Sequence, residues 1–422
     1  MSSNESVAVK RGKILYIFEA ALEYFISILV SGSFLATLTK QLGMSDSLTG
    51  ILSSIISLGC LFQLLSVFFR GKRVKKMVII MSIINQILFL LLYIIPLSNG
   101  TSNFKISLAV AVIFFAYAIY YFAHPKKINW LMSLVEDYKR GNFTANKEIV
   151  SLITGIAFTF FMGALVDRYA EKGELKTAFL ITAIVMSAIT VLHTATMIFI
   201  PEKSIEQTEN KGFMAGIAGI IKNKYILSVT ILFALYYIAT YISTPFYGTY
   251  LISELNFSLK FVSILIMISS IARILASKIL GAYADKNSFA AMLFICLGIF
   301  AVALLSATLA TPNNGKIMFT IYYIAYGVSQ GGINSALINL IFDYVPANQR
   351  ADSLAISQAT AGVVGFIATI AASPLIAMIQ KAGNRILGIT VYAQQLLSFL
   401  GMIFIFLAMI YIKKTLIKKR GS

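Results

Sequence analysis

Residues Ile14–Leu38 decide the fold; they read ILYIFEAALEYFISILVSGSFLATL. The stretch is long enough to cross a bilayer, at about 1.5 Å per residue against a hydrocarbon core of roughly 30 Å. It contains no Lys or Arg, yet it holds Glu19 and Glu23, which lie four residues apart and therefore on one face of a helix. A carboxylate in hydrocarbon costs at least about 2.5 kcal/mol, so the pair indicates a functional site beside water or a partner charge. The plainer alternative is that Glu19 lies near the inner end of the helix and reaches water there.

The composition places the whole chain in a membrane. Of its 422 residues, 58% are hydrophobic and 12% are charged, and long uncharged stretches of this kind are typical of transmembrane helices. The basic N-terminus is not followed by a short apolar run with a cleavage site, so the first span is expected to be retained rather than removed as a signal peptide. Cys60 and Cys296 both lie in apolar stretches, where two buried thiols are expected rather than a disulfide or a metal site.

Twelve apolar stretches follow one another along the chain, which predicts an all-α integral membrane protein with twelve transmembrane helices. After Ile14–Leu38 the stretches are Leu48–Phe69, Met77–Leu97, Ile106–Ala123, Glu148–Val166, Lys176–Ile200, Tyr225–Ile252, Leu259–Ala282, Phe289–Ala310, Ile317–Phe342, Ala351–Ile379 and Leu387–Ile412. Pro245 and Pro374 fall inside predicted spans, where each removes a backbone donor and frees a carbonyl that needs another partner.

The basic residues are distributed unevenly between the two sides of these spans. With the N-terminus in the cytoplasm, the inner segments and helix ends hold 25 of the 35 Lys and Arg residues, Lys126 and Lys127 among them, and the outer segments hold nine. Because cytoplasmic loops carry the excess of positive charge, we expect a multi-pass protein of the cell membrane with both termini in the cytoplasm. The formal charge of +18 therefore requires no nucleic-acid partner.

The longest polar break, Pro201–Lys224, separates two sets of six spans. Its segment PEKSIEQTENKGF has no apolar period and is typical of a solvated linker. We therefore expect an N-terminal six-helix half over residues 1–200, a cytoplasmic linker over 201–224 and a C-terminal six-helix half over 225–422. Two such halves in parallel form a repeat plan that is known among transporters.

Three short motifs occur at the matching places of this plan. Gly281–Lys286 (GAYADK) follows the eighth span, Val345–Ala351 (VPANQRA) follows the tenth, and Asn129–Phe143 lies between the fourth and the fifth. They resemble a cytoplasmic G-x-x-x-D-R/K signature, a V-P-x-x-x-R-A turn and a loop of one bacterial branch, all of the major facilitator superfamily. The resemblance covers the whole chain. It implies a secondary transporter with alternating access, in which Gly281, Asp285, Lys286 and Arg350 belong to the cytoplasmic gate.

The chain also departs from that pattern. The first-half copy of the signature should follow the second span, but Ser66–Arg73 keeps the basic residues and lacks the acid. Gly163–Arg168 (GALVDR) has the full pattern, but it follows the fifth span and lies outside by the charge count. We interpret it as a helix end with a surface ion pair, which contributes little energetically.

In the resembling family, helices one, four, seven and ten line the central cavity. On this chain the resemblance gives seven substrate-binding candidates besides the two glutamates: Tyr117, Tyr121, Tyr237, Tyr241, Tyr326, Gln330 and Asn334. Tyr237 with Tyr241 and Gln330 with Asn334 are i,i+4 pairs, so each pair shares a helix face. Hydroxyls, amides and ring faces suit a small polar, mostly neutral solute. The alternative is that the tyrosines belong to interfacial belts.

A few other polar residues lie in or near the spans. Arg273, inside the eighth span, could be a counter-ion, a substrate ligand or a partner of Asp285, and we favour the partner of Asp285 because intramembrane charges pair. Asn85, Gln86 and Gln358 are interpreted as interhelical hydrogen-bonding residues. His124, beside Lys126, is interpreted as an interfacial anchor, with a proton relay as the alternative.

The sequence offers no enzymatic chemistry. It has no Walker A run, no metal-ligand spacing and no nucleophile elbow, so no enzyme, cofactor or metal is predicted. Two like charges within about 6 Å cannot both ionise cheaply, and the deeper one, Glu23, is expected to carry the coupling proton, with Glu19 as an auxiliary nearer the cytoplasmic water. The predicted function is a monomeric, proton-coupled symporter of a small polar, sugar-like solute. The alternatives are an exporter of amphipathic compounds and a transporter-like sensor.

Overall fold

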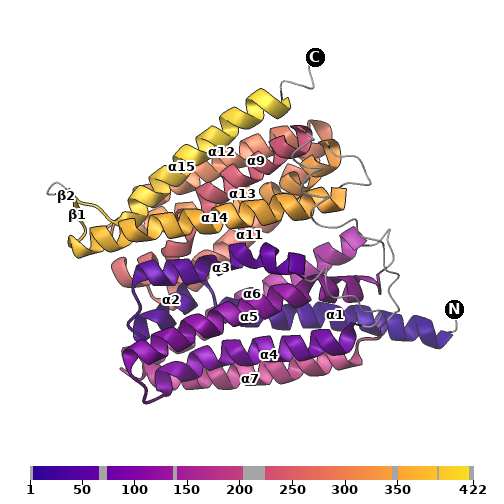
Figure 1. The fold of residues 1–422 in the computed structure, drawn as a ribbon, viewed down its shortest axis with the longest axis horizontal. Helices are drawn as coiled ribbons and strands as arrows, with labels where there is room; N and C mark the ends of the chain where they lie inside the picture. Colours follow the sequence, from indigo (N-terminus) through magenta and orange to yellow (C-terminus); the bar gives the residue numbers. More distant parts are fainter. Residues whose placement is uncertain are drawn as a thin grey trace. The chain divides into compact units, whose positions relative to one another are not determined.

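The computed structural model describes residues 3–65, 74–135, 140–202, 224–344, 350–386 and 389–417, and its elements are almost all helices (Figure 1). In chain order they are α1 (Ser3–Leu29), α2 (Gly32–Gln41), α3 (Asp46–Leu65), α4 (Lys75–Ile94), η2 (Ile95–Leu97), α5 (Ser102–Met132), α6 (Arg140–Glu171), α7 (Leu175–Phe199), α9 (Lys224–Tyr241), η4 (Thr244–Phe246), α10 (Tyr247–Thr249), η5 (Tyr250–Glu254), α11 (Leu259–Lys286), α12 (Phe289–Thr308), α13 (Gly315–Tyr344), α14 (Arg350–Lys381), β1 (Arg385–Ile386), β2 (Ile389–Thr390), α15 (Ala393–Ile412) and η7 (Lys413–Ile417). Most of the predicted linker, the Ser66–Arg73 stretch and the start of the Val345–Ala351 turn lie outside the described residues.

The predicted all-α membrane protein with twelve spans is confirmed. Within the described ranges, ten helices are long and apolar enough to cross a membrane, and the bent pair α1 and α2 makes an eleventh. Helix α13, with 30 residues, takes the place of the tenth predicted span, where polar residues such as Gln330 and Asn334 lower the hydropathy. The two-residue strands β1 and β2 pair antiparallel between α14 and α15.

The first span of each predicted half is not one continuous α-helix. Helices α1 and α2 meet at an angle of 42°. The junction contains Ser31 in extended conformation and Gly32 at φ +52°, a value that favours glycine. The seventh span is interrupted after α9, where Pro245 lies in the 3₁₀ turn η4 and cannot donate a backbone hydrogen bond.

Several helices are longer than predicted, and the extra length of two of them corrects an assignment. Helix α5 does not end before Pro125 but continues to Met132, a length of roughly 46 Å for its 31 residues. Lys127 therefore lies inside α5, near its end, rather than in a segment after the helix. Helix α11 continues to Lys286, so Gly281–Lys286 forms the last turns of a helix rather than a turn after it.

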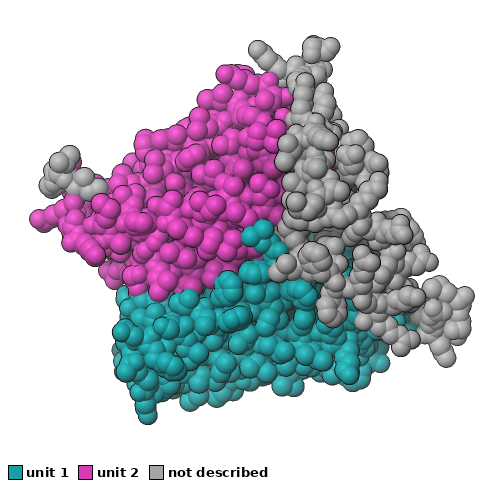
Figure 2. Space-filling view, viewed as in Figure 1, with its two compact units in different colours: residues 1–44, 61–209, 258–263 teal, residues 45–60, 210–257, 264–422 magenta. Residues whose placement is uncertain are grey.

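The described chain forms two compact units (Figure 2). Unit 1 comprises residues 1–44, 61–209 and 258–263, and unit 2 comprises residues 45–60, 210–257 and 264–422. The first residues of two helices therefore belong to a different unit from the segments that flank them in the sequence. The start of α3 is in unit 2, where Gln380 Nε2 donates to Asp46 Oδ2 at 2.8 Å. The start of α11 is in unit 1.

Unit 1 is built from α1, α2, α4, α5, α6 and α7, with α4 beside both α5 and α7 (Figure 1). Buried Trp130, Tyr16 and Val78 form one of its apolar clusters. Beside this cluster the backbone N–H groups of Val74 and Lys75 donate to Glu202 Oε1 at 2.6 and 2.8 Å, so a carboxylate caps the start of α4.

Unit 2 relies on small residues for close helix contacts. A Cβ atom at Gly327 or Gly331 of α13 would collide with the backbone of α11, so these glycines allow the two helices to approach each other closely. Gly332 faces Cys296 of α12, whose thiol is buried and free, as predicted for this residue. A second apolar cluster in unit 2 is centred on Phe246 and Ile376.

Candidate functional site

Four titratable side chains meet inside unit 1. Glu19 and Glu23 project from one face of α1, as predicted, and Lys127 from α5 bonds to both of them. Lys127 Nζ lies 2.7 Å from Glu19 Oε1 and also contacts Glu23 Oε1. His193 Nε2 of α7 lies 3.1 Å from the same oxygen of Glu19. We call Glu19, Glu23, Lys127 and His193 the ion cluster.

The members of the ion cluster differ in their access to water. The side chains of Glu19 and His193 are 1% and 0% exposed, and that of Lys127 is 4% exposed. The side chain of Glu23 is 24% exposed. This reverses the expected order, in which Glu19 was nearer to water. Helix α7 covers Glu19 through His193.

The neighbouring helix α4 supports the cluster through two amides. Gln86 Nε2 lies 2.9 Å from His193 Nδ1, and Asn85 Nδ2 donates to the Ala116 carbonyl of α5 at 2.8 Å. Both amides are buried and both bond between helices, so their interpretation as interhelical hydrogen-bonding residues is confirmed for the pair. Each bond ties α4 to a helix that carries a member of the cluster.

A small cavity opens beside Glu23. Its volume is about 10 Å³, the space of a single water molecule, and it is lined by Glu23, Met81, Ser82, Asn85, Tyr120, Ala123, His124 and Lys127. His124 lies within α5, eight residues before the end of the helix at Met132, and lines this cavity. Its interpretation as an interfacial anchor stays a prediction.

The cluster also has the composition of a cation site. Donor atoms of Glu19, Glu23 and His193 lie within 4.8 Å of one another. The Lys127 ammonium already bonds to both carboxylates, so a side-chain cation occupies the position that an ion would need. In this arrangement the site is an ion pair with two acidic partners rather than an open metal site.

The seven solute-binding candidates divide between the units. Tyr117 and Tyr121 of α5 belong to unit 1, where their rings stack with centroids 6.3 Å apart. In unit 2, Tyr237 and Tyr241 of α9 stack at 5.5 Å.

On α13, Tyr326 stacks on Tyr322 at 5.5 Å. Gln330 donates to the Tyr236 hydroxyl at 2.9 Å and is 9% exposed, whereas Asn334 is exposed. The described contacts therefore bring Gln330 into a network with Tyr236 and leave Asn334 outside it.

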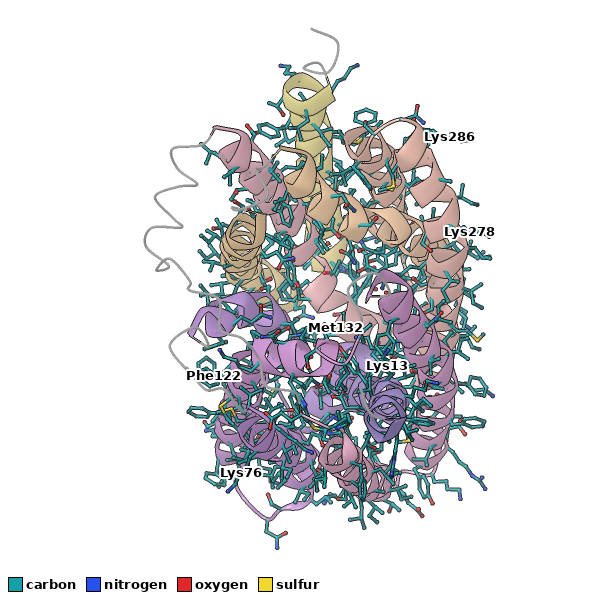
Figure 3. All side chains as sticks on the ribbon, turned by 90° about the vertical axis from the view of Figure 1, so that its right-hand side faces the viewer. Lys13, Lys76, Phe122, Met132, Lys278 and Lys286 are labelled. Atoms are coloured by element: carbon teal, nitrogen blue, oxygen red, sulfur yellow. The ribbon has the colours of Figure 1, made fainter. Side chains whose placement is uncertain are left out.

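The predicted cytoplasmic gate is described only in part. Lys286 is exposed on the last turn of α11, as is Lys278 two turns earlier (Figure 3). A Cβ atom at Gly281 would meet nothing within 4 Å. The side chains of Asp285 and Arg350 lie outside the described residues, so the pairing of half-buried Arg273 with Asp285 stays a prediction.

The Gly163–Arg168 motif has a more definite role than a surface ion pair. The Asp167 carboxylate accepts hydrogen bonds from the backbone N–H groups of Leu259 and Lys260, at 2.9 and 2.6 Å, and so caps α11. Gly163 lies one turn earlier, where a Cβ atom would come within 2.6 Å of Ser263 Oγ. The motif therefore fastens the first turn of α11 to α6 within unit 1, and our interpretation of it as an ion pair was wrong.

Two members of the ion cluster were not predicted. For Lys127 a signal existed, because Tyr120, His124 and Lys127 follow a helical spacing of four and three and so continue the face of α5 past Pro125. For His193 the sequence offered only a single histidine in an apolar span. Its partner Glu19 lies 174 residues away in the chain.

Comparison with known proteins agrees with this architecture. The structure is similar to that of a mutant of the nucleoside transporter NupG, with a TM-score of 0.76 and 14% sequence identity, over 96% of this chain and 100% of the other. A bacterial homologue of the iron transporter ferroportin has a TM-score of 0.70 and 11% identity, over 98% of this chain and 99% of the other. A bacterial homologue of the human lysosomal transporter Spinster has a TM-score of 0.65 and 13% identity, over 98% of this chain and 97% of the other. These identities show the fold alone.

No protein with a curated description matches the sequence. The sequence profile of the Major Facilitator Superfamily, in contrast, matches residues 17–369, most of the chain. The chain is therefore a multi-pass membrane transporter protein that belongs to the Major Facilitator Superfamily.

Proposed function

We propose that the protein is a proton-coupled secondary transporter that moves a small polar organic solute across the cell membrane by alternating access. The observation that carries the proposal is the buried Lys127 between Glu19 and Glu23. Buried charges of this kind are costly in a membrane and are found where ions or protons are handled. The ion cluster lies in a protein with a transporter fold, and it contains a carboxyl group that is proposed to bind the proton.

The charge of the ion cluster argues for a bound proton. With both carboxylates ionised, Lys127 charged and His193 neutral, the cluster carries one net negative charge. A buried net charge is strongly disfavoured, and one proton removes it. Glu23 is the group that can exchange this proton with water, because its side chain is 24% exposed and lines the water-sized cavity.

The proposed coupling step is local. When Glu23 binds a proton, its attraction to Lys127 weakens, and Lys127 stays with Glu19. When Glu23 releases the proton, the Glu23–Lys127 ion pair forms again and draws α1 and α5 together. If the Glu23–Lys127 contact has a different free energy in two conformations of the transporter, forming or breaking it shifts the equilibrium between them by that difference.

The solute is proposed to be recognised by neutral groups. In unit 2, Tyr236 bonds to Gln330, and Tyr237, Tyr241 and Tyr326 present stacked rings. Such hydroxyls, amides and rings bind sugars and sugar-containing molecules well. The fold similarity to a nucleoside transporter is consistent with a solute of this class.

A second candidate function, export of amphipathic compounds, is favoured by one feature of unit 2. An apolar groove of about 340 Å³ lies between α9, α14 and α15, lined by residues such as Ile238, Ala368, Ala371 and Phe404. A groove without polar lining would hold a hydrocarbon chain. Uptake and export assays of amphipathic dyes in the same vesicles separate this function from transport of a polar solute.

The test is a screen in proteoliposomes, followed by one substitution. Radiolabelled sugars and nucleosides are offered with and without an imposed pH gradient, and counterflow is measured for every solute that accumulates. In the substituted protein, Glu23→Gln imitates the protonated carboxyl with little change of volume. We expect it to abolish gradient-driven accumulation, because no proton can be released, and to permit counterflow exchange.

The matched control is Glu171→Gln, which removes an exposed carboxylate at the end of α6 and should leave both activities unchanged. Full gradient-driven accumulation by Glu23→Gln would show that another group, or another ion, provides the coupling.

We further propose six-helix halves over residues 1–200 and 225–422, a monomer in the cytoplasmic membrane, and cytoplasmic termini and linker. The proposal on orientation rests on the excess of basic residues in the predicted inner segments. A cysteine introduced as Ser204→Cys in the linker should resist a membrane-impermeant thiol reagent in intact cells. Ready labelling would reverse the orientation.

A further inference from the structure

The ion cluster is continued by a hydrogen-bonded chain that crosses three helices. Gln86 of α4 contacts His193 of α7, which contacts Glu19 of α1. All three side chains are buried, with residue exposures of 2%, 0% and 1%. The amide nitrogen of Gln86 is used on His193, while its Oε1 atom is buried without a partner in the described part of the chain. His193 is therefore the described side-chain partner of this amide.

The contact with Glu19 defines the role of one ring nitrogen of His193. A carboxylate offers no hydrogen, so this contact requires a proton on Nε2. The Gln86 amide holds the other ring nitrogen, Nδ1, at 2.9 Å. The Nε2–H group of His193 therefore points at Glu19.

This donor distinguishes the two glutamates. Glu19 Oε1 receives both the Lys127 ammonium and the His193 N–H, whereas the described polar contact of Glu23 is Lys127 alone. Hydrogen bonds from donors favour the ionised form of a carboxyl. A proton added to Glu19 would have to displace one of two buried donors. A proton added to Glu23 meets water and one flexible ammonium.

We infer that His193, oriented by Gln86, is a positioning residue that keeps Glu19 ionised and so leaves Glu23 as the carboxyl that exchanges the proton. The inference rests on the proposed function. Other titratable groups surround the pair, on the same helix and on its neighbours: Tyr16 on α1, Tyr120, His124 and Lys127 on α5, and Lys147 on α6. Of these, Lys127 contacts both carboxylates alike, so it cannot distinguish between them.

The inference is tested with protons alone, without a known solute. Infrared difference spectra of the purified protein in lipid, recorded between high and low pH, report protonated carboxyl groups. Subtraction of the spectra of a Glu19→Gln/Glu23→Gln variant leaves the signal of these two carboxyls. The wild type should show one titrating carboxyl, and Glu23→Gln should show none, because His193 and Lys127 hold Glu19 ionised.

The decisive variant adds His193→Leu to Glu23→Gln. Loss of the imidazole donor should let Glu19 take the proton, so the carboxyl signal should return. The variant Glu23→Gln/His193→Gln restores an N–H donor that cannot titrate, and the signal should disappear again. Where the leucine variant does not fold, Gln86→Leu in the Glu23→Gln background removes only the orientation of the ring and should return part of the signal.

The outcomes separate the two proposals. A carboxyl signal that persists in Glu23→Gln alone would overturn the assignment of the exchanging proton in the proposed function. Absence of the signal in Glu23→Gln and also in its His193→Leu and Gln86→Leu derivatives would overturn the role of His193 and leave Glu23 as the exchanging group.

Discussion

Unit 1 and unit 2 use different polar groups in their interiors. In unit 1, Glu19, Lys127 and His193 are almost completely buried and bond to one another. In the described part of unit 2, every fully buried polar side chain is neutral, as in the Tyr236–Gln330 and Tyr247–Ser398 pairs. Buried charge is suited to binding a proton, and buried neutral groups are suited to a solute. With the proposed function, this difference predicts that proton binding and solute binding can be separated by mutation.

The largest effect is expected from Lys127→Met. The substitution leaves Glu19 and Glu23 without their ammonium, and the loss of one partner of a buried ion pair costs about 3–5 kcal/mol of the free energy of unfolding. The loss should shrink as the pH falls, because protonation of the carboxyls removes the unpaired charge. Thermal unfolding in detergent at neutral and acidic pH measures both effects.

Two control variants sharpen this prediction. Lys127→Met/Glu19→Gln removes the buried charge together with its partner and should recover most of the stability. Lys76→Met removes an exposed lysine and should change the free energy of unfolding by less than about 0.5 kcal/mol. Equal destabilisation by the two single lysine substitutions would mean that the ion cluster contributes nothing special to unit 1.

An intermediate effect is expected in unit 2 from Gln330→Leu. The hydroxyl of Tyr236 is left buried without its partner, which costs about 1–3 kcal/mol in stability. Once a solute is identified, its affinity should fall by up to about tenfold for each 1.4 kcal/mol of lost binding. The infrared signal of Glu23 should remain unchanged, because no charged group has been altered. Tyr236→Phe removes the same hydrogen bond from the other side and serves as the matched variant.

The comparison breaks if Gln330→Leu changes the protonation of Glu23 as strongly as it changes solute affinity. In that case both units would take part in proton binding, and the neutrality of the buried groups in unit 2 would have no functional meaning.

The smallest effect is expected at Asp167. This residue belongs to the copy of the Gly-x-x-x-Asp motif in unit 1, and the copy in unit 2 begins at Gly281. Asp167 caps α11 through two backbone N–H groups, whereas Gly281 of the second copy adjoins open space. Asp167→Ala should cost about 1 kcal/mol, and Asp167→Asn less, because the asparagine oxygen can accept one of the two bonds. Equal losses for Ala and Asn would restore the ion-pair interpretation. Thermal unfolding of both variants measures the difference.

Most of the fold was predictable because hydrophobic stretches of bilayer length can be read directly from the sequence. The starts of α7 and α11 lie within one residue of the predicted spans. The break after α1 was not predicted, because Ser31 and Gly32 are small residues that occur in unbroken membrane helices as well. The early end assigned to the fourth span followed from Pro125, which interrupts a single hydrogen bond but does not end α5.

Half of the ion cluster was predictable, because two of its members lie close together in the sequence and the other two do not. Glu19 and Glu23 belong to one helix, so their spacing alone places them on the same face. Lys127 and His193 reach them only through the packing of α5 and α7 against α1. The roles assigned to the two carboxylates could not follow from depth along α1 either, because the cover provided by α7 decides which of them water reaches.

The distance in sequence between Glu19 and Lys127 also has a consequence for the synthesis of the protein. The two residues are 108 positions apart. At a translation rate of about 5–20 residues per second, the first helix exists for roughly 5–20 s before the ribosome has made its counter-ion. During that interval Glu19 is either protonated or held at the membrane surface, since an unpaired carboxylate in hydrocarbon is costly. The final position of α1 in the bilayer is therefore expected to be reached only after α5 has been inserted.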